Sequence, residues 1–165
     1  MKKLIFFLAL FMYIFKLYAA EPALIKAFEK ELAKFYNNKA IETVKIDDIS
    51  GTEDQYFNIF DDQEKQGVAV LTSAAGRFDR FDFMIVFNPD LQIKHVKVLM
   101  YRSQYGAEIT SKNWLKQFYK RKNADFRYGG DIQALSGATL SAQSLTQKIN
   151  RIKQNINQHF NDSID

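Results

Sequence analysis

The stretch that organises this chain is Leu135-Ser136-Gly137-Ala138-Thr139-Leu140-Ser141. A regular pattern follows it, in which apolar residues recur at three- and four-residue steps: Leu145, Ile149, Ile152, Ile156 and Phe160. Such a stripe predicts an amphipathic helix. The small residues then lie at a helix N-terminus, whose unpaired N–H groups and partial positive charge attract phosphate. Gly137 and Ala138 leave room for an anion, and the hydroxyls of Thr139 and Ser141 can bond a phosphate or be esterified by one.

A plainer interpretation of the same residues is an N-cap with a turn glycine. However, Ser136-Gly137-Ala138-Thr139, followed by Leu140 and Ser141, resembles the Ser/Thr-Gly-Ala-Thr signature of the FMN-binding domain family. That family includes the C and G subunits of Na⁺-pumping and Rnf-type oxidoreductases. The resemblance implies that Thr139 carries FMN through a phosphodiester bond installed by a flavin transferase. The main chain from Gly137 to Ser141 would hold the phosphate.

The resemblance covers roughly residues 67 to 155. Gly67 before a strand, a hairpin, the run from Tyr101 to Ile109 and the run from Trp114 to Phe118 follow the family's order. It implies that the first of these runs forms a glycine-containing turn that faces the flavin. Gly106 would let the backbone approach a flat ligand, and an aromatic side chain can stack on one. The candidates for this contact are Tyr101, Tyr105 and Trp114, for each of which core packing is the alternative.

The sequence departs from the family pattern at two places. The attachment motif usually has an Asp three residues before its Ser or Thr; here that residue is Gln133, with Asp131 two residues earlier. The run from Tyr101 to Ile109 also lacks the Glu-Thr-Pro-Gly character of the respiratory subunits. The first departure bears on covalent attachment, since a transferase can read that carboxylate. It bears less on FMN binding, which needs chiefly the helix end and the small residues.

Composition limits the other possibilities. The 165 residues suit one domain with a real core, and 47% of them are hydrophobic and 25% charged, as in ordinary globular proteins. The absence of cysteine excludes disulfides, thiolate metal sites and a cysteine nucleophile. His95 and His159 are too few and too isolated to indicate a metal site, and we interpret them as a strand residue and a solvated residue.

Residues 1–20 have the pattern of an export signal. Lys2 and Lys3 precede an uncharged apolar run from Leu4 to Phe15, and small residues end the segment. Twelve residues are too few for a spanning helix, which needs roughly 20. We therefore expect cleavage after Ala19 or Ala20 and an exported, periplasmic or membrane-associated protein; a retained anchor is the alternative. Without the three lysines of this segment, the formal net charge falls from +4 to +1, which implies no nucleic-acid or membrane-surface partner.

The remaining periodicities predict an α+β fold, a single domain in which helices flank an antiparallel sheet, because strand patterns are grouped before helix patterns. A helix is expected from Glu21 to Phe35 and a shorter one after Ser111. Turns are expected at 61–67 and 88–90. Strand patterns occupy 56–60, 68–71, 81–87 and 93–99, and more weakly 41–49. The expected organisation is a signal segment (1–20), a helix and connector (21–50) and an FMN-binding domain (51–165).

Together these observations predict an exported FMN-binding electron-transfer protein, more a redox carrier or subunit than a stand-alone enzyme. Its expected partners are a flavin transferase and a membrane or periplasmic redox protein, with no nucleic acid and no metal. The alternative is a non-redox periplasmic binding or scaffold module that keeps the fold without the cofactor. A hydrolase is disfavoured, since the chain has no Gly-x-Ser-x-Gly elbow and neither histidine has a recognisable catalytic context.

Overall fold

A computed structural model describes residues 22–47, 49, 53–119 and 125–162. The expected signal segment at 1–20 lies outside these residues. Five antiparallel strands follow one another in sequence order across one sheet. They are β1 (Glu42–Ile46), β2 (Gln55–Asp61), β3 (Glu64–Ala75), β4 (Arg80–Phe87) and β5 (Ile93–Met100). The described helices are residues 22–35, η1 (Ala107–Thr110), α2 (Lys112–Leu115), η2 (Lys116–Phe118) and α3 (Thr139–Asp162).

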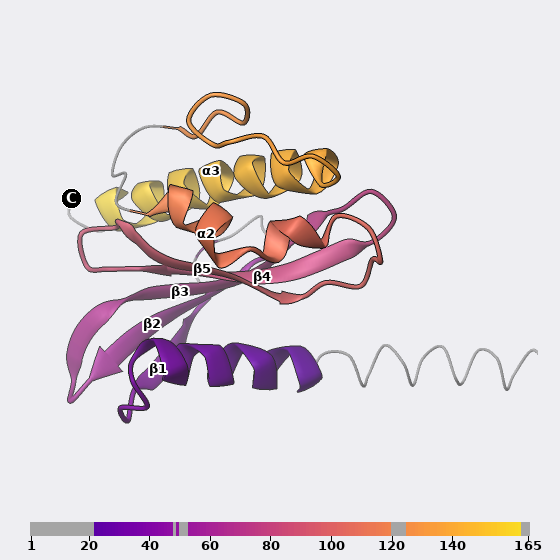
Figure 1. The fold of residues 1–165 in the computed structure, drawn as a ribbon. Coiled ribbons are helices and arrows are strands. Elements are labelled where there is room, and N and C mark those ends of the chain that lie inside the picture. The colour runs from indigo at the N-terminus through magenta and orange to yellow at the C-terminus, as the bar shows by residue number, and fades with distance from the viewer. Residues whose placement is uncertain (1–21, 48, 50–52, 120–124, 163–165) are drawn as a thin grey trace, which may run out of the picture.

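The sheet is the middle of three layers (Figure 1). The long helix α3 and the short helix α2 cover one face, and the helix at residues 22–35 covers the other. This arrangement confirms the α+β class expected from the grouping of strands before helices. The edge strand β1 pairs with β2 in the same sheet, so the connector and the segment after residue 50 share one hydrogen-bonded structure.

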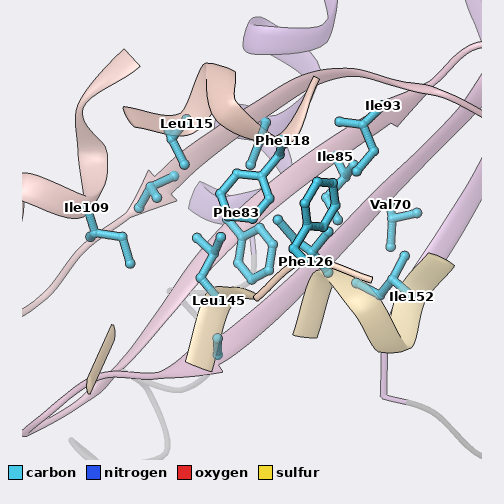
Figure 2. Close-up of a cluster of buried hydrophobic side chains, with 14 of the residues drawn as sticks. Val70, Phe83, Ile85, Ile93, Ile109, Leu115, Phe118, Phe126, Leu145 and Ile152 are labelled. Atoms are coloured by element: carbon cyan, nitrogen blue, oxygen red, sulfur yellow. The ribbon is translucent and has the colours of Figure 1, made fainter. Parts of the chain in front are cut away.

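The larger core lies between α3 and the sheet (Figure 2). The four leading residues of the helical stripe, Leu145, Ile149, Ile152 and Ile156, are completely buried, which confirms the predicted amphipathic helix. They pack with Phe83 and Ile85 of β4 and with Phe118 and Phe126 from the segments that cross above the sheet. The same face of the sheet therefore fixes both α3 and the chain that leads into it.

The second core is smaller and lies under the helix at residues 22–35. Phe28 and Leu32 of this helix are buried against strand residues that include Met84. The same helix half-covers the outer face of β5 at His95. His95 of β5 stacks on the Phe35 ring with 5.0 Å between centroids, and its Nε2 lies 3.0 Å from Glu31 Oε1. Burial lowers the pKa of His95, and the neighbouring Glu31 carboxylate opposes that shift.

The turn expected at residues 61–67 is much shorter in the structure. Only Asp62 and Gln63 lie between β2 and β3, and both have positive φ values, 48° and 70°. Residues 64–66 continue β3, although all three are polar, because the hairpin end projects into solvent and needs no apolar side chain there. The other expected turn, at 88–90, lies between β4 and β5 as predicted.

No helix in the described part of the chain is both long enough and apolar enough to cross a membrane. The same described residues contain no group of three or more His, Cys, Asp or Glu side chains arranged to hold a metal ion.

Candidate functional site

Helix α3 begins without a side-chain cap. The first intrahelical hydrogen bond runs from the Ala142 N–H to the Ala138 carbonyl at 2.9 Å, which makes Ala138 the N-cap residue. The methyl side chain of Ala138 cannot accept a hydrogen bond from the first N–H groups of the helix. The Thr139 hydroxyl does not cap the helix either, because it donates to the Leu135 carbonyl, earlier in the chain, at 3.2 Å. No acceptor among the described residues meets the amides of residues 139–141. The plain N-cap interpretation therefore does not hold, and the helix start presents free N–H donors.

These amides border a pocket of about 380 Å³. Thr139 is exposed and is therefore accessible at the pocket, whereas the neighbouring Ala138 and Ser141 are buried and form its inner side. The lining residues come from three separate segments and are Arg77, Tyr105, Gly106, Gly137, Ala138, Thr139, Leu140 and Ser141. The fold thus brings together the glycine-containing turn and the Ser-Gly-Ala-Thr segment, which the sequence had singled out separately.

Gly106 is where these two segments touch. It has a φ of +83°, and a Cβ at this position would lie 3.4 Å from the Gly137 carbonyl oxygen and 3.5 Å from Ala138 Cα. It would lie only 2.7 Å from the Tyr101 hydroxyl oxygen. That hydroxyl donates to the Tyr105 carbonyl at 2.7 Å and lies 3.4 Å from Ser141 Oγ. The Tyr101 hydroxyl therefore links two residues of the pocket, Tyr105 and Ser141, although Tyr101 itself is not among the lining residues.

Two further residues predicted near the flavin, besides Tyr101, are not among the residues that line the pocket. Trp114 is only 4% exposed and packs edge-on against Phe118 in the core. Its indole N–H donates to the Gln133 carbonyl at 2.8 Å, so its polar atom is satisfied inside the protein. Trp114 therefore shows the core packing that the sequence left as the alternative to a ring contact. Ser136 is exposed, and it too is not among the lining residues.

Arg77 is a pocket residue that the sequence did not identify. It lies in the turn between β3 and β4, which is closed by a 2.8 Å hydrogen bond from the Gly76 N–H to the Asp79 carbonyl. A cation in an exposed hairpin turn is common on any surface, so no local signal marks it. Its position beside α3 follows only from the sheet, which carries this turn to the helix start about 60 residues further along the chain.

Exposed apolar side chains form a rim along part of the same pocket. Phe78, Tyr105 and Leu140 are 67%, 68% and 57% exposed. The Phe78 and Tyr105 rings lie 6.1 Å apart, and the Arg77 guanidinium lies 5.1 Å from the Phe78 ring centre. Among the described residues only Val44 is a further large hydrophobic residue of comparable exposure. Exposed apolar groups gathered at one pocket are typical of a ligand or partner site.

The charges at the pocket are unevenly placed. Arg77 and the free amides of α3 supply positive charge on one side. The Glu108 carboxylate oxygens lie 3.6 Å from the point where a Cβ on Gly137 would be, and they supply negative charge on the other. An anion is consequently favoured at residues 139–141 and disfavoured beside Gly137.

Comparisons with known proteins give similarity to solved structures alone. No protein-family model matches the chain, and no curated protein sequence is significantly similar to it. The crystal structure of NqrC from Shewanella oneidensis matches 66% of this chain with 20% sequence identity and a TM-score of 0.48. The match spans about three fifths (61%) of the NqrC chain. A similarity of this extent does not assign a function.

Proposed function

We propose that this chain is an exported FMN-binding electron-transfer protein, with FMN attached to Thr139 through a phosphodiester bond. One observation carries the proposal: the uncapped start of α3 opens onto a pocket that also holds Arg77 and the exposed Thr139 hydroxyl. Unpaired amides, a guanidinium and a hydroxyl are the groups that bind phosphate in proteins. The volume of about 380 Å³ is within the range of small-molecule sites.

Different residues of the pocket bind the phosphate and the ring system of FMN. The amides of residues 139–141 and the Arg77 guanidinium bind the phosphate oxygens, which requires no movement of the α3 backbone. The exposed rings of Phe78 and Tyr105, with the Leu140 side chain, offer an apolar surface to a flat ring system. When bound, FMN would supply the redox chemistry. The rim remains open to solvent on the described structure, which leaves a route for electrons to a redox partner.

Covalent attachment requires a nucleophile that a modifying enzyme can reach. The Thr139 hydroxyl satisfies this because the residue is exposed and its proton already points to the Leu135 carbonyl, at 3.2 Å. In the proposed step, Thr139 Oγ attacks the FMN phosphorus of FAD and loses its proton. The bond between that phosphorus and the bridging oxygen breaks, and AMP leaves. A separate flavin transferase would catalyse this exchange, and a membrane or periplasmic protein would exchange electrons with the product.

Intact-mass spectrometry after co-expression with a flavin transferase tests the assignment. The wild-type chain should gain the mass of FMN less one water, and Thr139→Ser should gain it too because it keeps a hydroxyl. Thr139→Val keeps the shape of the side chain and should gain nothing. No increment on the wild type, or an increment that persists in Thr139→Val, would defeat the attachment. The mass of the native protein also reports whether residues 1–20 are removed.

The alternative function, a periplasmic binding or scaffold module without flavin, is favoured by Gln133. Its main chain is fixed, since its N–H donates to Gln117 Oε1 and its carbonyl accepts from Trp114, while its side chain is exposed. A transferase would therefore meet an amide where the family pattern has a carboxylate. If purified protein shows no flavin absorbance before or after transferase treatment, and Gln133→Asp does acquire flavin, the alternative is correct.

A further inference from the structure

A second, larger concavity runs along α3 and shares no residue with the pocket at Thr139. It has a volume of about 720 Å³ and lies between α3, the end of β3 and the residues that precede β2. We call it the α3 groove. Its lining is mostly polar and consists of Glu53, Asp54, Ser73, Ala74, Ala75, Arg80, Ser144, Gln147, Lys148, Arg151, Gln154 and Asn155.

A largely buried ion pair fixes one wall of the α3 groove. Lys148 Nζ lies 2.8 Å from Asp54 Oδ1, and the side chains are 19% and 2% exposed. The Thr72 hydroxyl donates to the same carboxylate oxygen at 2.5 Å. Removing two charges from water is unfavourable unless they are paired, so this arrangement holds Lys148 in a defined position. Its charge is balanced by Asp54 and contributes little net charge to the groove.

Two further polar side chains of the groove, Arg80 and Ser144, are also held in place. Arg80 donates from Nε and Nη2 to Ser73 Oγ, at 3.1 and 2.6 Å. Ser144 Oγ accepts the Ala75 N–H at 3.0 Å, so the hydroxyl proton of Ser144 stays available to another acceptor. Donors that are already oriented lose less entropy when a ligand binds.

Two guanidinium groups in the groove lack a carboxylate partner among the described residues. Arg80 bonds a neutral hydroxyl, and Arg151, one turn along α3 from Lys148, forms no salt bridge there. The opposing charge is the exposed carboxylate of Glu53. After the Asp54–Lys148 pair is set aside, the groove therefore presents two positive charges against one negative charge. Arginine forks match the planar or tetrahedral oxygens of carboxylate and phosphate groups.

We propose that the α3 groove is a binding site for a small polyanion that carries carboxylate or phosphate groups. Arg80 and Arg151 bind its oxyanions, and the Ser144 hydroxyl and Gln147 amide supply further donors. Glu53 restricts the site because it repels an anion that is placed at its end of the groove. This site requires no flavin and does not depend on the function proposed for the pocket at Thr139.

Titration of the ¹⁵N-labelled full chain with sodium citrate and, separately, sodium phosphate tests the proposal at constant ionic strength set by sodium chloride. The amide signals of Ser73, Ser144 and Gln147 should shift and saturate with at least one anion, with a Kd of about 1 mM or tighter. The anion that saturates the signals identifies the preferred chemistry. Chloride alone should produce no saturable shift.

Three variants and one control separate the site from general charge effects. Arg80→Gln and Arg151→Gln should each weaken binding about tenfold, the effect of losing one charge-assisted contact. Glu53→Gln should strengthen binding several-fold, which damage to the fold cannot do. Arg127→Gln removes the same charge from a side chain 83% exposed outside the groove and should leave Kd unchanged. Absence of saturation with both anions, or equal weakening by Arg127→Gln, overturns the proposal.

Discussion

Gly106→Ala tests whether the two segments at the pocket depend on close contact. Gly129 provides the matched control, because its φ of +78° is nearly that of Gly106 at +83°. No heavy atom lies within 4 Å of a Cβ added at Gly129, whereas at Gly106 that atom would lie 2.7 Å from the Tyr101 hydroxyl oxygen. Both substitutions place an L-residue in the left-handed region, and only one of them adds a collision.

The two substitutions should lower the free energy of unfolding by different amounts. At Gly129 the left-handed backbone costs alanine about 1–2 kcal/mol, partly offset by about 0.4–1 kcal/mol of reduced unfolded-state entropy, so a loss near 1 kcal/mol is expected. At Gly106 the Tyr101 hydroxyl must also move, which breaks its 2.7 Å hydrogen bond to the Tyr105 carbonyl. That loss adds about 1 kcal/mol, and the overpacking adds about 1 kcal/mol more. The free energy of unfolding should therefore fall by about 3 kcal/mol in Gly106→Ala.

Urea denaturation followed by circular dichroism measures both values. A double-mutant cycle makes the test sharper, because Tyr101→Phe removes the colliding oxygen and leaves contacts of 3.4 and 3.5 Å at Gly106. In that background, Gly106→Ala should cost about as much as Gly129→Ala, a coupling of about 1–2 kcal/mol. Equal losses for the two glycine variants in the wild-type background, or no coupling to Tyr101, would refute the assigned contact.

Three further predictions concern the core, the pocket and the second helix layer. Ile149→Ala, at a completely buried position, should lower the free energy of unfolding by about 2–5 kcal/mol in the same assay, and a loss below about 1 kcal/mol would contradict the packing of α3. Arg77→Gln should weaken non-covalent FMN binding about tenfold by fluorescence titration, while Arg127→Gln should not change it. The pKa of His95 is lowered chiefly by burial, so the unfolded chain binds the proton more tightly. Stability should therefore decline as the pH falls below about 6.5, and the pH slope should be smaller in His95→Gln; an unchanged slope would exclude His95 as its source.

The local spacing of apolar and turn residues in the sequence predicted much of the fold. The three- and four-residue spacing of Leu145, Ile149 and Ile152 predicted α3, since one face of that helix is buried from Leu145 to Ile156. The hairpin between β4 and β5 was predicted because turn residues separate two apolar runs. The turn before β3 was predicted too long. Its two residues, Asp62 and Gln63, both have positive φ without the glycine that usually marks such a turn.

The sequence by itself determined the helices, most of the strands and the small-residue segment at Thr139, because spacing and residue size act between neighbours in the chain. Only the tertiary structure decided what surrounds that segment. It placed Arg77 at the pocket, buried Trp114 in the core and paired Asp54 with Lys148 in one wall of the α3 groove. Each of these contacts joins segments far apart in the chain, and they form because the sheet and α3 bury a shared core. Periodicity within one segment carries no information about that alignment.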